Sequence, residues 1–221
     1  MKYSFILIFS AVGFLANSFA VASPQGKAMR PAHTYSIVAR DEKTGELGAA
    51  VQSHWFSVGG SVIWAAPGIG AVATQSFVEK SYGPLGLALM RAGKTAPKAL
   101  AALLAADDHT DVRQVGMVDA SGKVINFTGE HAIIEHCNIV GRGFAVQANL
   151  MDRATVCEVM AKAYKNTKGD LAARMMAALE AAQNEGGDIR GKQSAALLVV
   201  SGDRKLPAWD GRLFDLRVED H

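Results

Sequence analysis

The sequence lacks an excess of charge of either sign. It carries 23 basic and 21 acidic residues, and its formal net charge at pH 7 is +2. Lys2, Lys27 and Arg30 precede residue 34 with no acidic residue among them, so residues 34–221 hold 20 basic against 21 acidic groups. A protein that binds nucleic-acid phosphates needs a basic surplus. We therefore expect no nucleic-acid partner, and the charge gives no support to binding at a membrane surface.

Cysteine is scarce, with Cys137 and Cys157 as the only two in the chain. A single bridge would not make a disulfide scaffold, and Cys157 lies among apolar residues in a helical pattern. We expect two buried free thiols. Pairing of the two cysteines stays open if the protein reaches an oxidising compartment.

Patterns that hold metals and cofactors are also lacking. His131, His136 and Cys137 have neither the spacing of a helical two-histidine pair nor that of paired CxxC motifs. Gly68-Ile69-Gly70 and Gly141-Arg142-Gly143 lack the strand-to-helix context of a dinucleotide-binding loop. The G-x-S-x-G motif of many serine hydrolases is absent. We expect no metal site and no cofactor.

No long apolar run follows the one at the amino terminus. Tyr3 to Phe14 is almost wholly apolar, and Ala20-Val21-Ala22 supplies the small residues of a cleavage site. This pattern predicts a signal peptide at residues 1–22, and the run is too short to favour an uncleaved membrane anchor. Residues 23–33 are polar and aperiodic, which predicts a flexible leader or propeptide. We expect a periplasmic or secreted protein with no membrane attachment after signal cleavage.

Hydrophobic periodicity continues through residues 34–221 without a break in composition, which indicates one domain. The predicted strands are residues 34–40, 46–52, 61–66, 69–74, 113–118, 123–128, 144–149, 195–200 and 213–218. The predicted helices are residues 84–92, 95–106, 153–165 and 171–184. Turn residues divide most strands into hairpins, and hairpins joined by paired helices predict an α+β domain whose helices cover antiparallel sheets.

Polar side chains recur where the predicted strands end. The candidates for substrate binding are Arg40, Gln52, His54, Gln75, Ser76, Gln147, Arg190, Lys192 and Gln193. Antiparallel hairpins can bring such strand ends to one edge of a sandwich. We therefore predict that Thr34, Arg40, Ser53, Gln75, Asn149 and Asp188 converge on one pocket. For any single residue, an ordinary polar strand end is the alternative.

Thr34 is the candidate nucleophile, because it begins the first predicted strand. A threonine with a free α-amino group needs no histidine, since the amine, with a pKa of about 7.7–8.0, can accept the hydroxyl proton. Ser53 and Asp188 could polarise that amine. Backbone donors near Gln75, or the amide of Asn149, could stabilise an oxyanion. The alternative is that Thr34 is an ordinary β-branched residue at the start of a strand.

Several sequence blocks resemble one family. They are TYSIVARD, ELGAAVQSHWFSVG, GAVATQSF, YGPLGLALMRAG, FAVQAN and GGDIRGKQSAALLVV, and together they extend from Thr34 to about residue 201. They resemble domain of unknown function 1028, which is assigned to the N-terminal-nucleophile (Ntn) hydrolase superfamily. The resemblance implies a four-layer α-β-β-α sandwich of two antiparallel sheets between helices. It also implies that Thr34 is the nucleophile, that Ser53 supports it, and that Asn149 and Asp188 lie on loops lining the same pocket.

The sequence departs from the superfamily pattern in two places. Thr34 follows 33 residues, and the preceding residue is His33, whereas a glycine often precedes the cleaved bond in self-processing members. No lysine occurs around Ser61 to Ile63, where proteasome-type members place one. A catalytic site here would have to use Arg40, Lys192 or the α-amine alone.

These observations lead us to expect an exported hydrolase that cleaves an amide bond of a small-molecule or peptidic substrate. The Thr34 nucleophile would act after removal of residues 1–33. A catalytically silent binding or assembly module of the cell envelope is the alternative. The sequence leaves open whether the protein forms a homo-oligomer.

Overall fold

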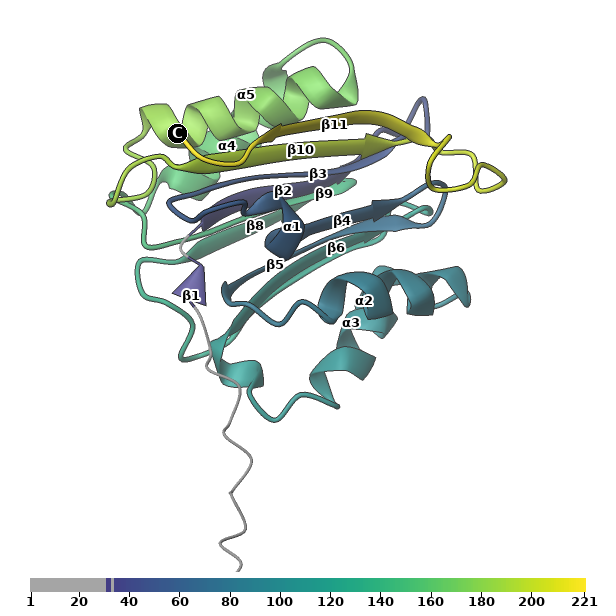
Figure 1. Ribbon diagram of the computed structural model, residues 1–221, viewed down its shortest axis with the longest axis horizontal. Helices are drawn as coiled ribbons and strands as arrows, with labels where there is room; N and C mark the ends of the chain where they lie inside the picture. Colours follow the sequence, from purple (N-terminus) through teal and green to yellow (C-terminus); the bar gives the residue numbers. More distant parts are fainter. Residues whose placement is uncertain (1–30, 33) are drawn as a thin grey trace, which may run out of the picture.

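A computed structural model describes residues 31–32 and 34–221 of the chain (Figure 1). The predicted signal peptide and most of the predicted leader lie outside the described residues. One part of the leader does not fit the prediction of an aperiodic segment. Pro31–Ala32 forms a two-residue strand, β1, that pairs with Phe77 and Ser76.

The described strands form two antiparallel sheets. The six-stranded sheet has the order β11 (Arg212–Val218), β10 (Ser194–Val200), β3 (Leu47–Ser53), β2 (Thr34–Arg40), β9 (Phe144–Asn149) and β8 (Cys137–Gly141). The five-stranded sheet has the order β1, β5 (Gly70–Phe77), β6 (Arg113–Asp119) and β7 (Val124–Thr128), and β4 (Ile63–Ala66) also pairs with β5. The prediction of an α+β protein with antiparallel sheets is confirmed, because every strand pair is antiparallel.

Helices cover the outward faces of both sheets (Figure 1). The four predicted helices are present as α2 (Tyr82–Arg91), α3 (Ala96–Leu104), α4 (Val156–Asn166) and α5 (Leu171–Asn184). The apolar sides of α4 and α5 pack on the six-stranded sheet, and α2 and α3 pack on the five-stranded one. A third apolar cluster lies between the sheets, where Val38, Ala49, Ala73 and Val118 meet. None of the helices in the described residues is long and apolar enough to cross a membrane.

Two local expectations were wrong. The predicted strand 61–66 begins only at Ile63, because Gly59–Val62 forms a short helix, α1, that turns both Val58 and Val62 into the core. Strand β8 was not expected, since it is an edge strand in which exposed residues alternate with half-buried ones. Its pairing with β9 and the packing of Ile139 on the core supply the stability that its sequence pattern does not reveal.

The expectation of free thiols was also wrong. Cys137 of β8 and Cys157 of α4 form a disulfide with a Cα–Cα distance of 6.0 Å. The two residues are 20 apart in sequence, and the pairing of β8 with β9 brings Cys137 under the helix. Without knowledge of β8, the sequence could not place Cys137 near α4.

Candidate active site

Thr34 lies at the start of β2, a strand paired on both sides. Antiparallel pairing places it opposite Ser53 of β3 and opposite Asn149 of β9. Its Oγ1 hydroxyl donates to Oγ of Ser53 at 3.2 Å, and all three residues are 0% exposed. The structure therefore brings together three of the four predicted catalytic residues, while their catalytic roles stay predictions.

A buried amide network connects Thr34 to the second sheet. Nε2 of Gln75 on β5 donates to the carbonyl oxygen of Thr34 at 3.1 Å and to Oε1 of Gln114 on β6 at 2.8 Å. Nδ2 of Asn149 donates to the same Gln114 oxygen at 3.1 Å. Gln114 in turn donates to the carbonyl oxygen of Ala148 at 3.1 Å. This network fixes the end of β2 against β5, β6 and β9 at once.

A second set of polar contacts lies two residues further along the same strands. Ser36 donates to Oε1 of Gln75 at 2.6 Å. Nε2 of Gln147 donates to Oγ of Ser36 and to the carbonyl oxygen of Ala73, both at 3.2 Å, and its Oε1 accepts from Asn126 at 2.8 Å. Gln147 is therefore fully engaged in holding the sheets together, so its predicted role in substrate binding gains no support from its position.

Asp188 approaches the same end of the six-stranded sheet from the loop between α5 and β10. It forms an isolated bridge with Met151, and its Oδ2 accepts from the backbone N–H of His54, the residue after Ser53. The carboxylate is fully buried and forms a salt bridge with Arg190, whose NH2 lies 2.6 Å from Oδ2. Asp188 thus contacts the backbone just after Ser53 and its charge is balanced by Arg190, while the predicted roles of both residues stay predictions.

Arg40 is the clear correction to the predicted pocket. It is the last residue of β2, opposite Leu47, whereas Thr34 is the first. Six residues of extended strand span about 20 Å, so Arg40 cannot reach Thr34. The sequence showed both residues as polar ends of one strand but did not show that Ser53 and Asn149 would lie at the Thr34 end alone.

Other predicted binding residues have separate surroundings. Gln52 is opposite Tyr35 and faces the helix side of the sheet, since alternate residues point to opposite faces. Ser76 uses its Oγ to accept from the backbone N–H of Ile133 at 3.0 Å. Lys192 is exposed, and Gln193 donates to Asp220 at 2.9 Å. These residues lie near the site without joining its hydrogen-bonded centre.

Gln114 is the central residue that the sequence interpretation missed. It sits second in a predicted strand, where a single polar residue suggested nothing special. The available signal was a glutamine at the end of each of two apolar strands, Gln75 and Gln114, because a buried amide needs a hydrogen-bonding partner, but their pairing came only from the strand register.

Tyr35, the residue after Thr34, stays neutral in the folded protein. Burial, followed by the negative charge of Asp188, raises the pKa of Tyr35 well above its usual value. Tyr35 therefore stays protonated and donates to Oε1 of Gln183 at 3.0 Å. Within the described residues, no group of three or more histidine, cysteine, aspartate or glutamate side chains could hold a metal ion. The arrangement offers a hydroxyl pair and several amides for chemistry.

Comparisons with known proteins agree with the sequence resemblance. The model of a family described as "Family of unknown function (DUF1028)" matches residues 34–221. The crystal structure of protein SPO2555 from Silicibacter pomeroyi, described with that family, has a TM-score of 0.76 and 27% identity, covering 86% of this chain and 79% of that one. Anbu, an ancestral beta-subunit from Yersinia bercovieri, has a TM-score of 0.37 and 11% identity over 84% and 87% of the two chains, too little for any argument. No curated protein matches the sequence.

Proposed function

Because this chain belongs to DUF1028, a family of unknown function, over residues 34–221, we propose its activity from the residues around Thr34. The protein is an exported hydrolase with the four-layer sandwich of the Ntn superfamily. It cleaves an amide bond of a small-molecule or peptidic substrate in the periplasm or outside the cell. Thr34 is its nucleophile once residues 1–33 have been removed.

One observation carries the proposal. Thr34 is the first residue of a central strand. Its hydroxyl donates to Ser53, and its backbone carbonyl oxygen accepts a hydrogen bond from Gln75. A nucleophile that carries its own base needs this kind of fixed backbone, since the hydroxyl and amine belong to the same residue. The flanking Asn149 and the buried Asp188 supply the further groups that the reaction requires.

The reaction then proceeds in two steps, acylation of Thr34 and hydrolysis of the ester that forms. The free α-amine of Thr34 takes the hydroxyl proton while Oγ1 attacks the substrate carbonyl carbon, and the amine returns a proton to the leaving nitrogen as the C–N bond breaks. Water next attacks the resulting ester and gives a proton to the amine, which passes it to Oγ1 as the acid product leaves. Asp188, whose charge is paired with Arg190, holds the backbone N–H of His54 next to Ser53 in this scheme.

Asn149 is the side-chain donor for the oxyanion. Its Nδ2 gives one hydrogen to Gln114, and an amide nitrogen has a second hydrogen to offer. A preorganised donor of this kind contributes about 3–4 kcal/mol to transition-state stabilisation in enzymes that use one. Gln114 holds the donor in place, so it acts as a positioning residue.

Removal of the leader is a requirement of this chemistry. In the uncut chain the nitrogen of Thr34 is an amide and cannot accept a proton, and Thr34 is completely buried. In the part of the leader that the structure describes, Pro31 and Ala32 pair with the domain through β5. Such a short strand dissociates easily, which favours trimming by an envelope protease over self-cleavage next to His33.

The test compares proteins that start at Thr34 and at Ser23, each treated with a β-lactone probe and analysed by intact mass. The form starting at Thr34 should gain one probe mass, located at Thr34. Thr34→Ala should lose labelling by at least about a thousandfold, as expected for loss of a nucleophile, and Thr34→Ser should keep part of it. Thr44→Ala, which removes an exposed threonine hydroxyl, is the matched control.

The uncut form decides between the candidate functions. If the protein starting at Ser23 is labelled as fast as the other while residues 23–33 remain attached, Thr34 is not an amino-terminal nucleophile. A binding or assembly module of the cell envelope would then be the better interpretation.

A further inference from the structure

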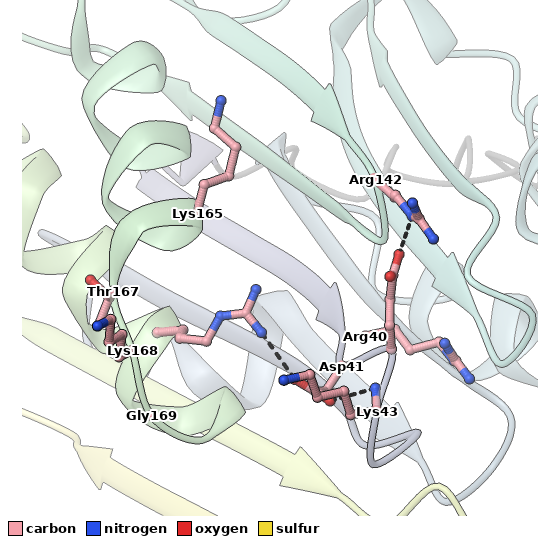
Figure 2. A pocket seen from close by; sticks show the side chains of 10 residues that line it. Arg40, Asp41, Lys43, Arg142, Lys165, Thr167, Lys168 and Gly169 are labelled. Carbon is pink, nitrogen blue, oxygen red and sulfur yellow. Dashed lines mark hydrogen bonds and ion pairs between the residues drawn. The ribbon is translucent and has the colours of Figure 1, made fainter.

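A pocket of about 490 Å³ lies at the other end of β2 from Thr34 (Figure 2). Three connections form it: the turn after β2, the turn between β8 and β9, and the segment from the end of α4 to the first turns of α5. Its volume falls in the range of about 300–1,000 Å³ that is common for small-molecule sites. The pocket is therefore large enough for a ligand and separate from the proposed hydrolase site.

Positive charge dominates this pocket. The basic residues that line it are Arg40, Lys43, Arg142, Lys165, Lys168 and Arg174, and the acidic ones are Asp41 and Glu42. Six cations against two carboxylates leave four positive charges in excess. The chain as a whole has a net charge of only +2, so this concentration is a local feature.

Both carboxylates are already occupied by partners within the pocket. Oδ2 of Asp41 lies 3.0 Å from NH1 of Arg174, and Oε1 of Glu42 lies 2.5 Å from Nε of Arg142. Figure 2 draws both contacts as dashed lines. Both acidic groups are thus paired with two of the six cations, which leaves four cations that could attract an anionic ligand.

The remaining cations have no ion-pair partner among the described residues. Lys43, Lys165 and Lys168 form no salt bridge there, and neither does Arg40. Nε of Arg40 is moreover buried with no hydrogen-bond partner in that part of the chain. The guanidinium of Arg40 lies beside Gly45 and Gly122, two residues that do not line the pocket, so the case for a bound anion rests on the three lysines.

The base of the pocket is held rigidly. Arg174 lies over the ring of Tyr164, 4.3 Å from its centroid, and is paired with Asp41. Burial alone would raise the pKa of Asp41, but backbone hydrogen bonds from Thr44 and Lys43 and the charge of Arg174 lower it below its usual value. Asp41 therefore stays ionised at neutral pH and fixes Arg174 in position.

We propose that this pocket binds a small molecule carrying two or more phosphoryl groups, free in solution. Lysine ammonium groups are point charges suited to phosphoryl oxygens, and arginine adds planar donors. Cations from three separate connections line a pocket wider than one phosphate needs, which favours a ligand with several charged groups. Thr167 and Gly169, which also line the pocket, add a hydroxyl and backbone groups for neutral hydrogen bonds.

Calorimetry with inorganic pyrophosphate as the probe tests this proposal on the purified protein at low salt. Pyrophosphate should bind at least about tenfold more tightly than orthophosphate, because it engages more of the cations at once. The double variant Lys165→Gln with Lys168→Gln should weaken pyrophosphate binding at least about tenfold. Its matched control is Lys80→Gln with Lys94→Gln, which removes two exposed lysines near α2.

Three outcomes would overturn the proposal. One is no detectable binding of pyrophosphate at about 1 mM, a concentration that a site of even modest affinity would register. Another is an equal loss in the control variant, which would mean non-specific attraction. The third is citrate binding as tightly as pyrophosphate, which would remove the preference for phosphoryl groups.

A sedimentation assay separates the free ligand from a lipid headgroup. Vesicles containing phosphatidylglycerol present phosphoryl groups on a surface, and the protein should not sediment with them. Sedimentation that the Lys165 and Lys168 substitutions abolish would assign the pocket to a membrane surface and overturn the proposal.

Discussion

The two ends of β2 differ in the polar groups that surround them. At Thr34 the hydrogen-bonded network consists of uncharged amides and hydroxyls, fully buried and bonded to one another across both sheets, with the paired charges of Asp188 and Arg190 beside it. At Arg40 the surrounding groups are charged, reach solvent, and several have no ion-pair partner among the described residues. Buried neutral groups must find exact partners, because each unmade hydrogen bond costs about 1–3 kcal/mol. Exposed charges carry no such demand, since water satisfies them.

This contrast predicts that the Thr34 end is the more sensitive to substitution. Gln114→Ala should lower the free energy of unfolding by about 3–5 kcal/mol, because the amide donors of Gln75 and Asn149 lose their acceptor and the smaller side chain leaves a cavity. Urea denaturation of the variant measures the loss. Gln193→Ala, which removes an amide bonded to Asp220 at the surface, should cost less than about 0.5 kcal/mol. A cost below about 1 kcal/mol for Gln114→Ala would contradict the importance of the network.

The disulfide should also contribute more stability than the ion pairs at the Arg40 end, and a hydrogen bond connects it to the network around Thr34. The carbonyl oxygen of Cys137 accepts from Gln114 at 3.3 Å. Replacing both cysteines by serine should cost about 3 kcal/mol, from the closure of a loop between residues 20 apart. Thermal and urea unfolding of the double variant should match the wild type in dithiothreitol. Titration of two free thiols in the denatured, unreduced wild type would refute the bridge.

Substitutions at the Arg40 end should lower the free energy of unfolding by less, and the loss should depend on pH. The pKa of Asp41 in the folded protein lies below its usual value of 3.8, so the stability that its charge contributes is present above about pH 4. That contribution is lost as the pH falls through the folded pKa. Asp41→Asn should therefore cost about 1–2 kcal/mol at pH 7, and its difference from the wild type should shrink below pH 4.

Glu42→Gln is the control for Asp41, because the Glu42 side chain is 48% exposed. An exposed ion pair contributes about 0–1 kcal/mol, so this variant should unfold almost like the wild type. Denaturant titrations between pH 3 and pH 7 compare the two variants. A cost of Asp41→Asn that does not change with pH would mean that the charge of Asp41 is unimportant.

Local sequence patterns predicted most of the secondary structure. Two examples are local features that need no tertiary contact: the hairpin turn after Arg40 and the start of the helix at Asp170. Oδ1 of Asp170 caps that helix by accepting from the backbone N–H of Ala173 at 2.7 Å. Strand β8 and helix α1 were not predicted, because each is stabilised by packing and pairing partners distant in sequence. The candidate site was predicted only in part. The sequence pattern shows that Ser53 and Asn149 lie at strand ends, whereas the role of Gln114 depends on hydrogen bonds to residues distant in sequence.

The sequence by itself determined the hairpins, the four long helices, the family, and the choice of Thr34 as the residue of interest. These rest on periodicity, turn chemistry and recognisable blocks of residues, all of which are local properties of a chain. Only the tertiary structure decided that Thr34 and Arg40 face different surroundings, that Gln114 joins the two sheets, and that Cys137 meets Cys157. Those facts depend on strand register and on the stacking of the sheets, which are set by the summed packing of residues far apart in the sequence.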